Sequence, residues 1–165
     1  MPASTARAAA AAVALVGWAG LAVQFSATLS ASGSLGETIW ILSRFFTVLT
    51  NLVVAVVFTA LAFGRRVSPF LMGGATLAIV LVGVVYMLLL RGLVELSGGR
   101  LLADLLLHKV VPLLAPAYWA LFAPKGGLRL RDPWLWALYP LLYFGYAVAR
   151  AYAGHTDHSG DAGTT

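Results

Sequence analysis

The sequence predicts an all-α protein, a polytopic bundle of transmembrane helices, and two observations carry that prediction. The first is composition: 61% of the 165 residues are hydrophobic and 10% are charged, whereas a soluble domain has about 45–50% apolar and about 25% charged residues. The second is that five apolar stretches each approach the roughly 20 residues that a spanning helix needs. This composition excludes a water-soluble enzyme, a disordered protein and a nucleic-acid-binding module.

Turn-forming residues separate the five apolar stretches. The first stretch follows Arg7 and ends before the Ser- and Gly-rich segment 30–34. The second ends at Gly64, the third begins after Pro69, and the fourth ends at Pro124, which two glycines follow closely. We therefore expect five spanning helices, at residues 8–29, 40–63, 70–90, 105–123 and 134–153.

The first stretch is also compatible with a cleaved signal peptide, because Arg7 precedes it and small residues follow at 27–31. Its apolar run, however, is longer than the usual 7–15 residues of such a segment, and it contains Trp18 and Gln24. We expect it to be retained as a helix.

Basic residues predict the orientation of the bundle, because cytoplasmic loops carry an excess of Lys and Arg. One set of helix ends holds most of them: Arg7, Arg65, Arg66, Lys125, Arg129 and Arg131. This places the N-terminus in the cytoplasm and the C-terminus outside. Residues 1–153 are then one transmembrane domain, and the polar residues 154–165 are a disordered tail.

Polar side chains inside the predicted spans are candidates for function, since ionisable groups in hydrocarbon usually face a cavity or a partner. In the second span Arg44, Thr47 and Asn51 share one face of a continuous helix. In the fourth, Asp104 and His108 are one turn apart, so the carboxylate can hold the imidazole. Four residues after His108, a proline is expected to kink that helix.

Tyrosines add to this set. Tyr139, Tyr143, Tyr146 and Arg150 share one face of the fifth span, and the two central tyrosines are too deep to be interfacial anchors, so we expect them to find partners inside the bundle. Because successive helices alternate direction, several polar residues fall in the same, outer half of the bilayer: Gln24, Arg44, Thr47, Asn51, Tyr86, Asp104, His108, Tyr146 and Arg150. A shared depth predicts one polar cavity that opens outward.

The chain has no cysteine, which excludes disulfides and thiolate metal sites. One histidine and one aspartate within the spans are too few ligands for a metal. We therefore expect neither a metal nor another cofactor.

Four short motifs occur in order along the chain: Phe45-Phe46-Thr47-Val48-Leu49-Thr50-Asn51, Leu107-His108-Lys109-Val110-Val111-Pro112, Leu121-Phe122-Ala123-Pro124-Lys125-Gly126 and Tyr139-Pro140-Leu141-Leu142-Tyr143. In this order they resemble the bacterial membrane proteins labelled Pr-six-Pr, over about residues 10–150. That group in turn resembles the eukaryotic androgen-induced-gene family, intramembrane threonine enzymes that hydrolyse fatty acid esters of hydroxy fatty acids. The resemblance implies a multi-pass protein of the bacterial cytoplasmic membrane, with Thr47 as nucleophile and His108 as base.

The residues suggest roles for the other candidates. Asp104 would orient the imidazole, Arg44, Asn51 or Tyr86 would donate to the oxyanion, and Tyr146 would help to bind substrate. Members of the family usually have a sixth span, so we expect either that a second copy or a partner helix fills its place or that this chain is altered in function. The alternative is a non-catalytic protein that binds lipid or supports assembly, whose polar residues only join helices.

Overall fold

The computed structural model describes residues 3–159, with side chains as far as residue 152, and none of the described residues is in a strand. The helices follow in the order α1 (Ala3–Ser32), α2 (Leu35–Leu42), α3 (Phe46–Ala62), α4 (Pro69–Val85), the π-helix η1 (Tyr86–Leu90), α5 (Gly98–Leu105), the π-helix η2 (Leu106–Val110), α6 (Val111–Phe122) and α7 (Asp132–Ser159). The expected all-α class is therefore confirmed.

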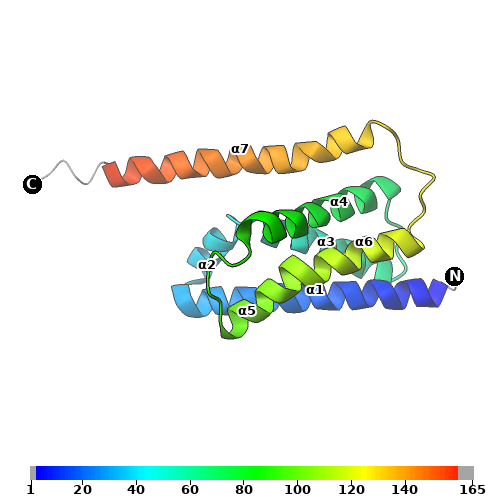
Figure 1. Ribbon diagram of the computed structural model, residues 1–165, viewed down its shortest axis with the longest axis horizontal. Coiled ribbons are helices and arrows are strands. Elements are labelled where there is room, and N and C mark those ends of the chain that lie inside the picture. The colour runs from blue at the N-terminus through cyan, green and yellow to red at the C-terminus, as the bar shows by residue number, and fades with distance from the viewer. Residues whose placement is uncertain (1–2, 160–165) are drawn as a thin grey trace, which may run out of the picture.

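The helices α1, α3, α4 and α6 form a bundle around one apolar core. The most extensive contacts join α1 to α3 and α4 to α6, and the core between them includes Val13, Val54, Phe58, Ile79 and Val111. The helix α7 lies along one side of this bundle, and its far end lies opposite the start of α1 along the long axis (Figure 1).

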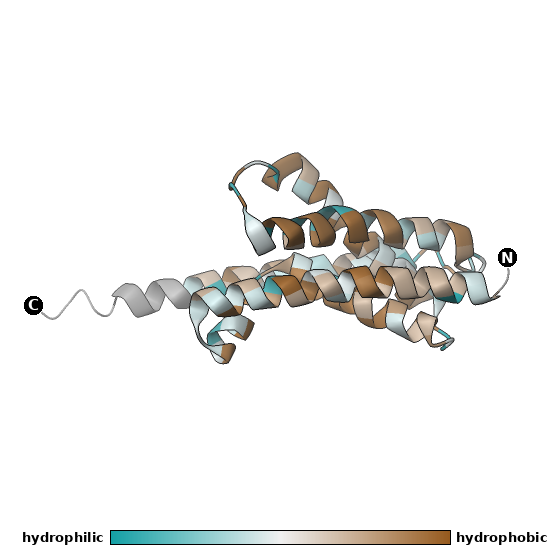
Figure 2. Cartoon of the chain, turned by 90° about the horizontal axis from the view of Figure 1, so that it is seen from below, coloured by the Kyte–Doolittle hydropathy of each residue, from teal (hydrophilic) through white to brown (hydrophobic). Residues whose placement is uncertain are grey.

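Hydrophobic residues occur along the length of the long helices (Figure 2), and many of their large apolar side chains are exposed. Leu88, Leu113 and Leu142 are each more than 70% exposed. Contiguous apolar surface of this extent is unusual for a protein that faces water and is compatible with insertion into a membrane.

Three of the described helices are long and apolar enough to cross a membrane: Ala3–Ser32, Pro69–Leu90 and Gly98–Phe122. The pair α2 and α3 would add a fourth as one bent span. The helix α7 is not in this set, because Tyr, Trp and Pro residues and Arg150 make its sequence less apolar. A helical membrane bundle fits the structure, whereas the number of five spans is not established by it.

The second predicted helix is broken, which corrects the expectation of one continuous helix over 40–63. Its two parts, α2 and α3, meet at an angle of 94°. The hydroxyl of Ser43 donates to the carbonyl of Trp40 at 2.9 Å, so a side chain bonds the last turn of α2 where the helix would otherwise continue. Arg44 lies in the break, and the face that it was expected to share with Thr47 and Asn51 does not exist.

Two further boundaries differ from the expected ones. The helix expected from residue 105 already begins at Gly98, and the segment just before Pro112 is the π-helix η2, where the N–H of Val111 bonds to the carbonyl of Leu106. A π-turn accommodates a distorted helix within one continuous span. The helix α7 continues to Ser159, so residues 154–159 are helical rather than part of a disordered tail, because the helix propagates beyond the apolar stretch; residues 160–165 lie outside the described residues.

Candidate functional site

The site is centred on the contact between Thr47 and His108. Thr47 lies in the first turn of α3, immediately after the break, and His108 lies in η2. The hydroxyl oxygen Oγ1 of Thr47 is 3.1 Å from Nε2 of His108. A hydroxyl within hydrogen-bond reach of an imidazole nitrogen is the arrangement in which the imidazole can take the proton of a nucleophile.

Asp104 lies on the other side of the same imidazole. Its Oδ1 is 3.0 Å from Nδ1 of His108, close enough for a charged contact, although the N–H is not aligned well enough for a regular hydrogen bond. An ionised carboxylate there favours the tautomer that carries its proton on Nδ1. In that tautomer Nε2 has a free lone pair and accepts the hydrogen bond of Thr47.

Tyr86 connects η1 to this pair. Its hydroxyl donates to Oδ2 of Asp104 at 2.6 Å, and its ring stacks on the ring of His108 with the centroids 4.4 Å apart. The ammonium group of Lys109 lies 3.8 Å from the same carboxylate oxygen. Both π-helices thus contribute to the site, and π-turns are frequent at functional sites.

Asn51 holds the two sides of the site together. Its side chain is fully buried, and its amide nitrogen donates to the carbonyls of Thr47 at 2.9 Å and Leu107 at 3.1 Å. Because both amide hydrogens are used, Asn51 ties α3 to η2 and is not free to donate to an oxyanion. This corrects the expected oxyanion role.

A small cavity of about 170 Å³ opens beside the pair. Its polar lining residues are Gln24, Thr47, Arg100, Asp104 and His108, so four of the nine residues expected at one depth share this cavity. Arg100 was missed from the sequence as a site residue, because α5 was expected to be a loop.

Two expected site residues, Arg44 and Tyr146, lie elsewhere. Arg44 is exposed in the α2–α3 break, and neither residue is among those that line the cavity of Thr47. The hydroxyl of Tyr146 instead contacts the hydroxyl of Ser43, with the two oxygens 3.3 Å apart. Neither residue is placed to donate to an oxyanion or to bind a substrate in that cavity.

One face of α7 holds the break in place, and we name its four residues Tyr139, Tyr143, Tyr146 and Arg150 the α7 clamp. Tyr139 contacts the hydroxyl of Thr50 at 3.2 Å, and Tyr143 donates to the carbonyl of Arg44. These contacts confirm that the deep tyrosines of the fifth stretch find partners in the bundle.

Arg150 makes the most contacts of the α7 clamp. Its guanidinium donates to the hydroxyls of Ser43 and Tyr146 and to the carbonyl of Trp40, each at 2.7 Å, and lies 3.3 Å from the centre of the Trp40 ring. Donors from α7 thus reach two carbonyls at the break, those of Trp40 and Arg44.

Within the described residues, no three metal-ligating side chains of His, Asp or Glu gather at one place. Comparison of this chain with protein-family models, with curated proteins and with solved structures gives no match.

Proposed function

We propose that this chain is a membrane-embedded hydrolase of fatty-acyl esters, with Thr47 as nucleophile and His108 as general base. The observation that carries the proposal is the 3.1 Å contact between Thr47 and His108, supported from behind by Asp104. Helix packing alone does not require a hydroxyl, an imidazole and a carboxylate to lie in a row in which each group contacts the next. The resemblance to the androgen-induced-gene family agrees with the same two residues.

The reaction would proceed in two halves. In the first, Nε2 of His108 takes the proton of Thr47, whose oxygen attacks the ester carbonyl; the alcohol then leaves with that proton, and an acyl-threonine remains. In the second, His108 takes a proton from water, the resulting hydroxide attacks the acyl-threonine, and Thr47 recovers the proton as the fatty acid is released. Asp104 would stabilise the imidazolium in both halves.

The oxyanion would be bound by the start of α3. The first turn of a helix has N–H groups without intrahelical acceptors, and here the N–H groups of Val48 and Leu49 bond back to the carbonyl of Phe45. The N–H groups of Phe46 and Thr47 make no such bond and would be the donors to the developing charge. Donors of this kind contribute about 2.7–4 kcal/mol each to acyl transfer.

The proposed setting is the bacterial cytoplasmic membrane, crossed five times, with the N-terminus inside. In this arrangement α2 and α3 are one broken span and α7 is the fifth span. The opposite positions of the start of α1 and the end of α7 (Figure 1) agree with an odd number of crossings. A second copy or a partner helix would take the place of the family's sixth span.

The test is labelling of the purified protein by fluorophosphonate probes, which react with activated hydroxyls. We expect labelling of the wild type and its loss in Thr47→Ala and in His108→Ala, with a double variant little worse than either single one. Thr76→Ala is the matched control, because Thr76 is also a helical threonine but is buried and bonds only its own helix at Met72. Labelling that survives Thr47→Ala contradicts the proposal, and a wild type without labelling or ester hydrolysis favours the non-catalytic alternative.

A further inference from the structure

We infer that the groove between α4 and α6 binds the acyl chain of the ester and measures its length. The inference rests on the proposed function, because it needs an ester held at the Thr47–His108 pair. The groove has a volume of about 650 Å³, within the range of about 300–1,000 Å³ that is typical of small-molecule sites.

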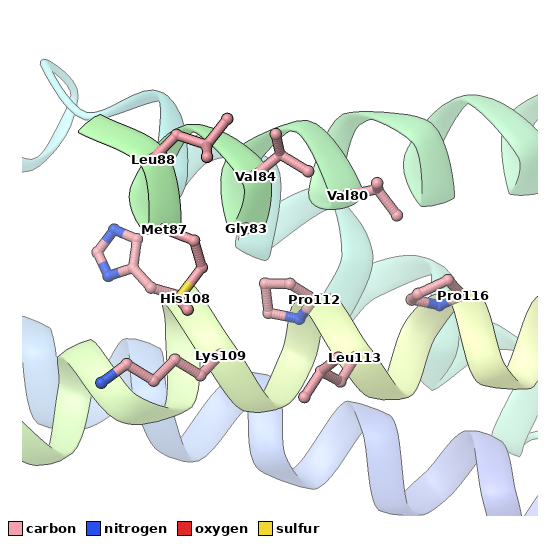
Figure 3. A pocket seen from close by; sticks show the side chains of 10 residues that line it. All are labelled: Val80, Gly83, Val84, Met87, Leu88, His108, Lys109, Pro112, Leu113 and Pro116. Atoms are coloured by element: carbon pink, nitrogen blue, oxygen red, sulfur yellow. The ribbon is translucent and has the colours of Figure 1, made fainter. Parts of the chain in front are cut away.

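The groove is apolar along its length and polar at one end (Figure 3). Met87 and His108 lie at one end, Gly83 and Pro112 lie in the middle, and Val80 faces the other end (Figure 3). The polar lining residues are His108 and Lys109, which are neighbours in η2. A ligand that matches this lining has a hydrocarbon chain and one polar end.

The polar end of the groove is also the catalytic end of the site. His108 lines both the groove and the small cavity that contains Thr47. An acyl chain in the groove would therefore place its carboxyl end beside the imidazole. Lys109 lies next to that end and supplies a positive charge for the polar part of the ester.

Gly83 and Pro112 lie in the middle of the groove, where α4 and α6 approach closely. A Cβ atom added at Gly83 would lie 2.8 Å from Cβ of Pro112, so no larger residue fits there without a shift. Neither Gly83 nor Pro112 has a long side chain that could extend into the groove at this point. The space above it is therefore available to a ligand.

The length of the groove sets the length of chain that it can hold. From His108 to Pro116 the helix advances eight residues, about 12 Å at 1.5 Å per residue. A short acyl chain would end before Val80, whereas a long chain would pass beside it. Val80 and Pro116 then act as specificity-determining residues at the far end.

The test compares the hydrolysis of umbelliferyl butyrate, octanoate and palmitate by purified protein in detergent. In Val80→Trp we expect the palmitate-to-butyrate ratio of kcat/KM to fall at least tenfold, because the indole blocks the far end. In Val84→Trp, nearer to His108, the octanoate-to-butyrate ratio falls as well. Val56→Trp is the matched control: Val56 is 54% exposed and Val84 is 48% exposed, but Val56 is on α3, outside the groove, and we expect unchanged ratios.

Unchanged ratios in Val80→Trp and Val84→Trp, with hydrolysis intact, overturn the groove while the proposed function stands. Absence of hydrolysis in the wild type overturns the proposed function instead. A binding measurement that needs no turnover covers variants that fold poorly: a diazirine-labelled palmitate ester is crosslinked to the Thr47→Ala protein. Crosslinks concentrated in residues 80–88 and 109–116 support the inference, and crosslinks spread evenly over α1 and α7 overturn it.

Discussion

Replacing Arg150 by methionine should loosen the α7 clamp and destabilise the protein. The methionine keeps an unbranched apolar side chain on α7 but removes the guanidinium and its three hydrogen bonds to Ser43, Tyr146 and Trp40. It also removes the cation that lies 3.3 Å from the centre of the Trp40 ring.

The expected loss follows from these contacts. Hydrogen bonds between membrane helices average about 0.6 kcal/mol each in measured cycles, so the three bonds together contribute about 2 kcal/mol. The cation–π contact adds about 0.5–1 kcal/mol at a partly exposed site. The free energy of unfolding should therefore fall by about 2–3 kcal/mol.

The assay is reversible unfolding of purified protein in mixed micelles by increasing SDS, followed by the helical circular dichroism signal. Arg91→Met is the matched control, because the side chain of Arg91 makes no hydrogen bond or ion pair within the described residues. If Arg150→Met is as stable as Arg91→Met, the α7 clamp does not hold the bundle and the reasoning is wrong. Arg150→Lys should recover part of the loss, since it keeps the charge but not the planar fork.

Three further predictions concern the site, the packing and the topology. Tyr86→Phe keeps the ring on His108 but removes the 2.6 Å hydrogen bond to Asp104, and a bond to a charged acceptor contributes about 1.5–3 kcal/mol. Fluorophosphonate labelling should therefore slow about tenfold or more. An unchanged labelling rate would contradict this prediction. Gly20→Ala places Cβ 2.6 Å from Leu107 and should lower the free energy of unfolding in SDS by about 1–3 kcal/mol. Gly145→Ala, with open space around it, should not lower it measurably. Equal stability of the two variants would refute the close packing at Gly20. Alkaline phosphatase, which is active only outside the cytoplasm, should be active when fused after the last residue, and activity of a fused cytoplasmic reporter instead would reverse the proposed orientation.

The sequence predicted the helical class and the juxtaposition of Thr47 and His108 for physical reasons. Long apolar stretches must satisfy their backbone as helices in a membrane, so their existence and alternation follow from composition alone. Depth along such helices is set by the rise per residue. Residues at equal depth in Phe46–Ala62 and in Gly98–Phe122 can therefore be matched before the packing is known.

The break between α2 and α3 could not be predicted, because residues 43–45 contain neither glycine nor proline. The donors that satisfy its carbonyls come from α7, about 100 residues later in the chain. Expecting a continuous helix gave Arg44 a place on the same face as Thr47 and Asn51, which it does not have. The same reasoning considered how deep a residue lies in the bilayer but not the direction in which its side chain points. It therefore assigned Tyr146 to the site.

Arg100 was missed for a different reason. The glycines at 98–99 favour a loop in sequence terms, but Gly98 adopts a φ of +56° and α5 starts there. The charged face of α5 is therefore presented to the cavity of Thr47. Amphipathic turns at the end of a span are easily taken for loops when the apolar stretch is used as the boundary.

The position of the α7 clamp in the chain has a consequence for biogenesis. Membrane helices enter the bilayer in the order in which the ribosome makes them, and α7 is made after every helix that it touches. Until then the carbonyl of Arg44 lacks its donor and the carbonyl of Trp40 has only the hydroxyl of Ser43, so the α7 clamp does not yet hold the start of α3. A nascent chain that has inserted only as far as α6 would thus carry both Thr47 and His108 but not yet the α7 clamp. If the proposed function is correct, we expect full hydrolytic activity only when synthesis has passed Arg150.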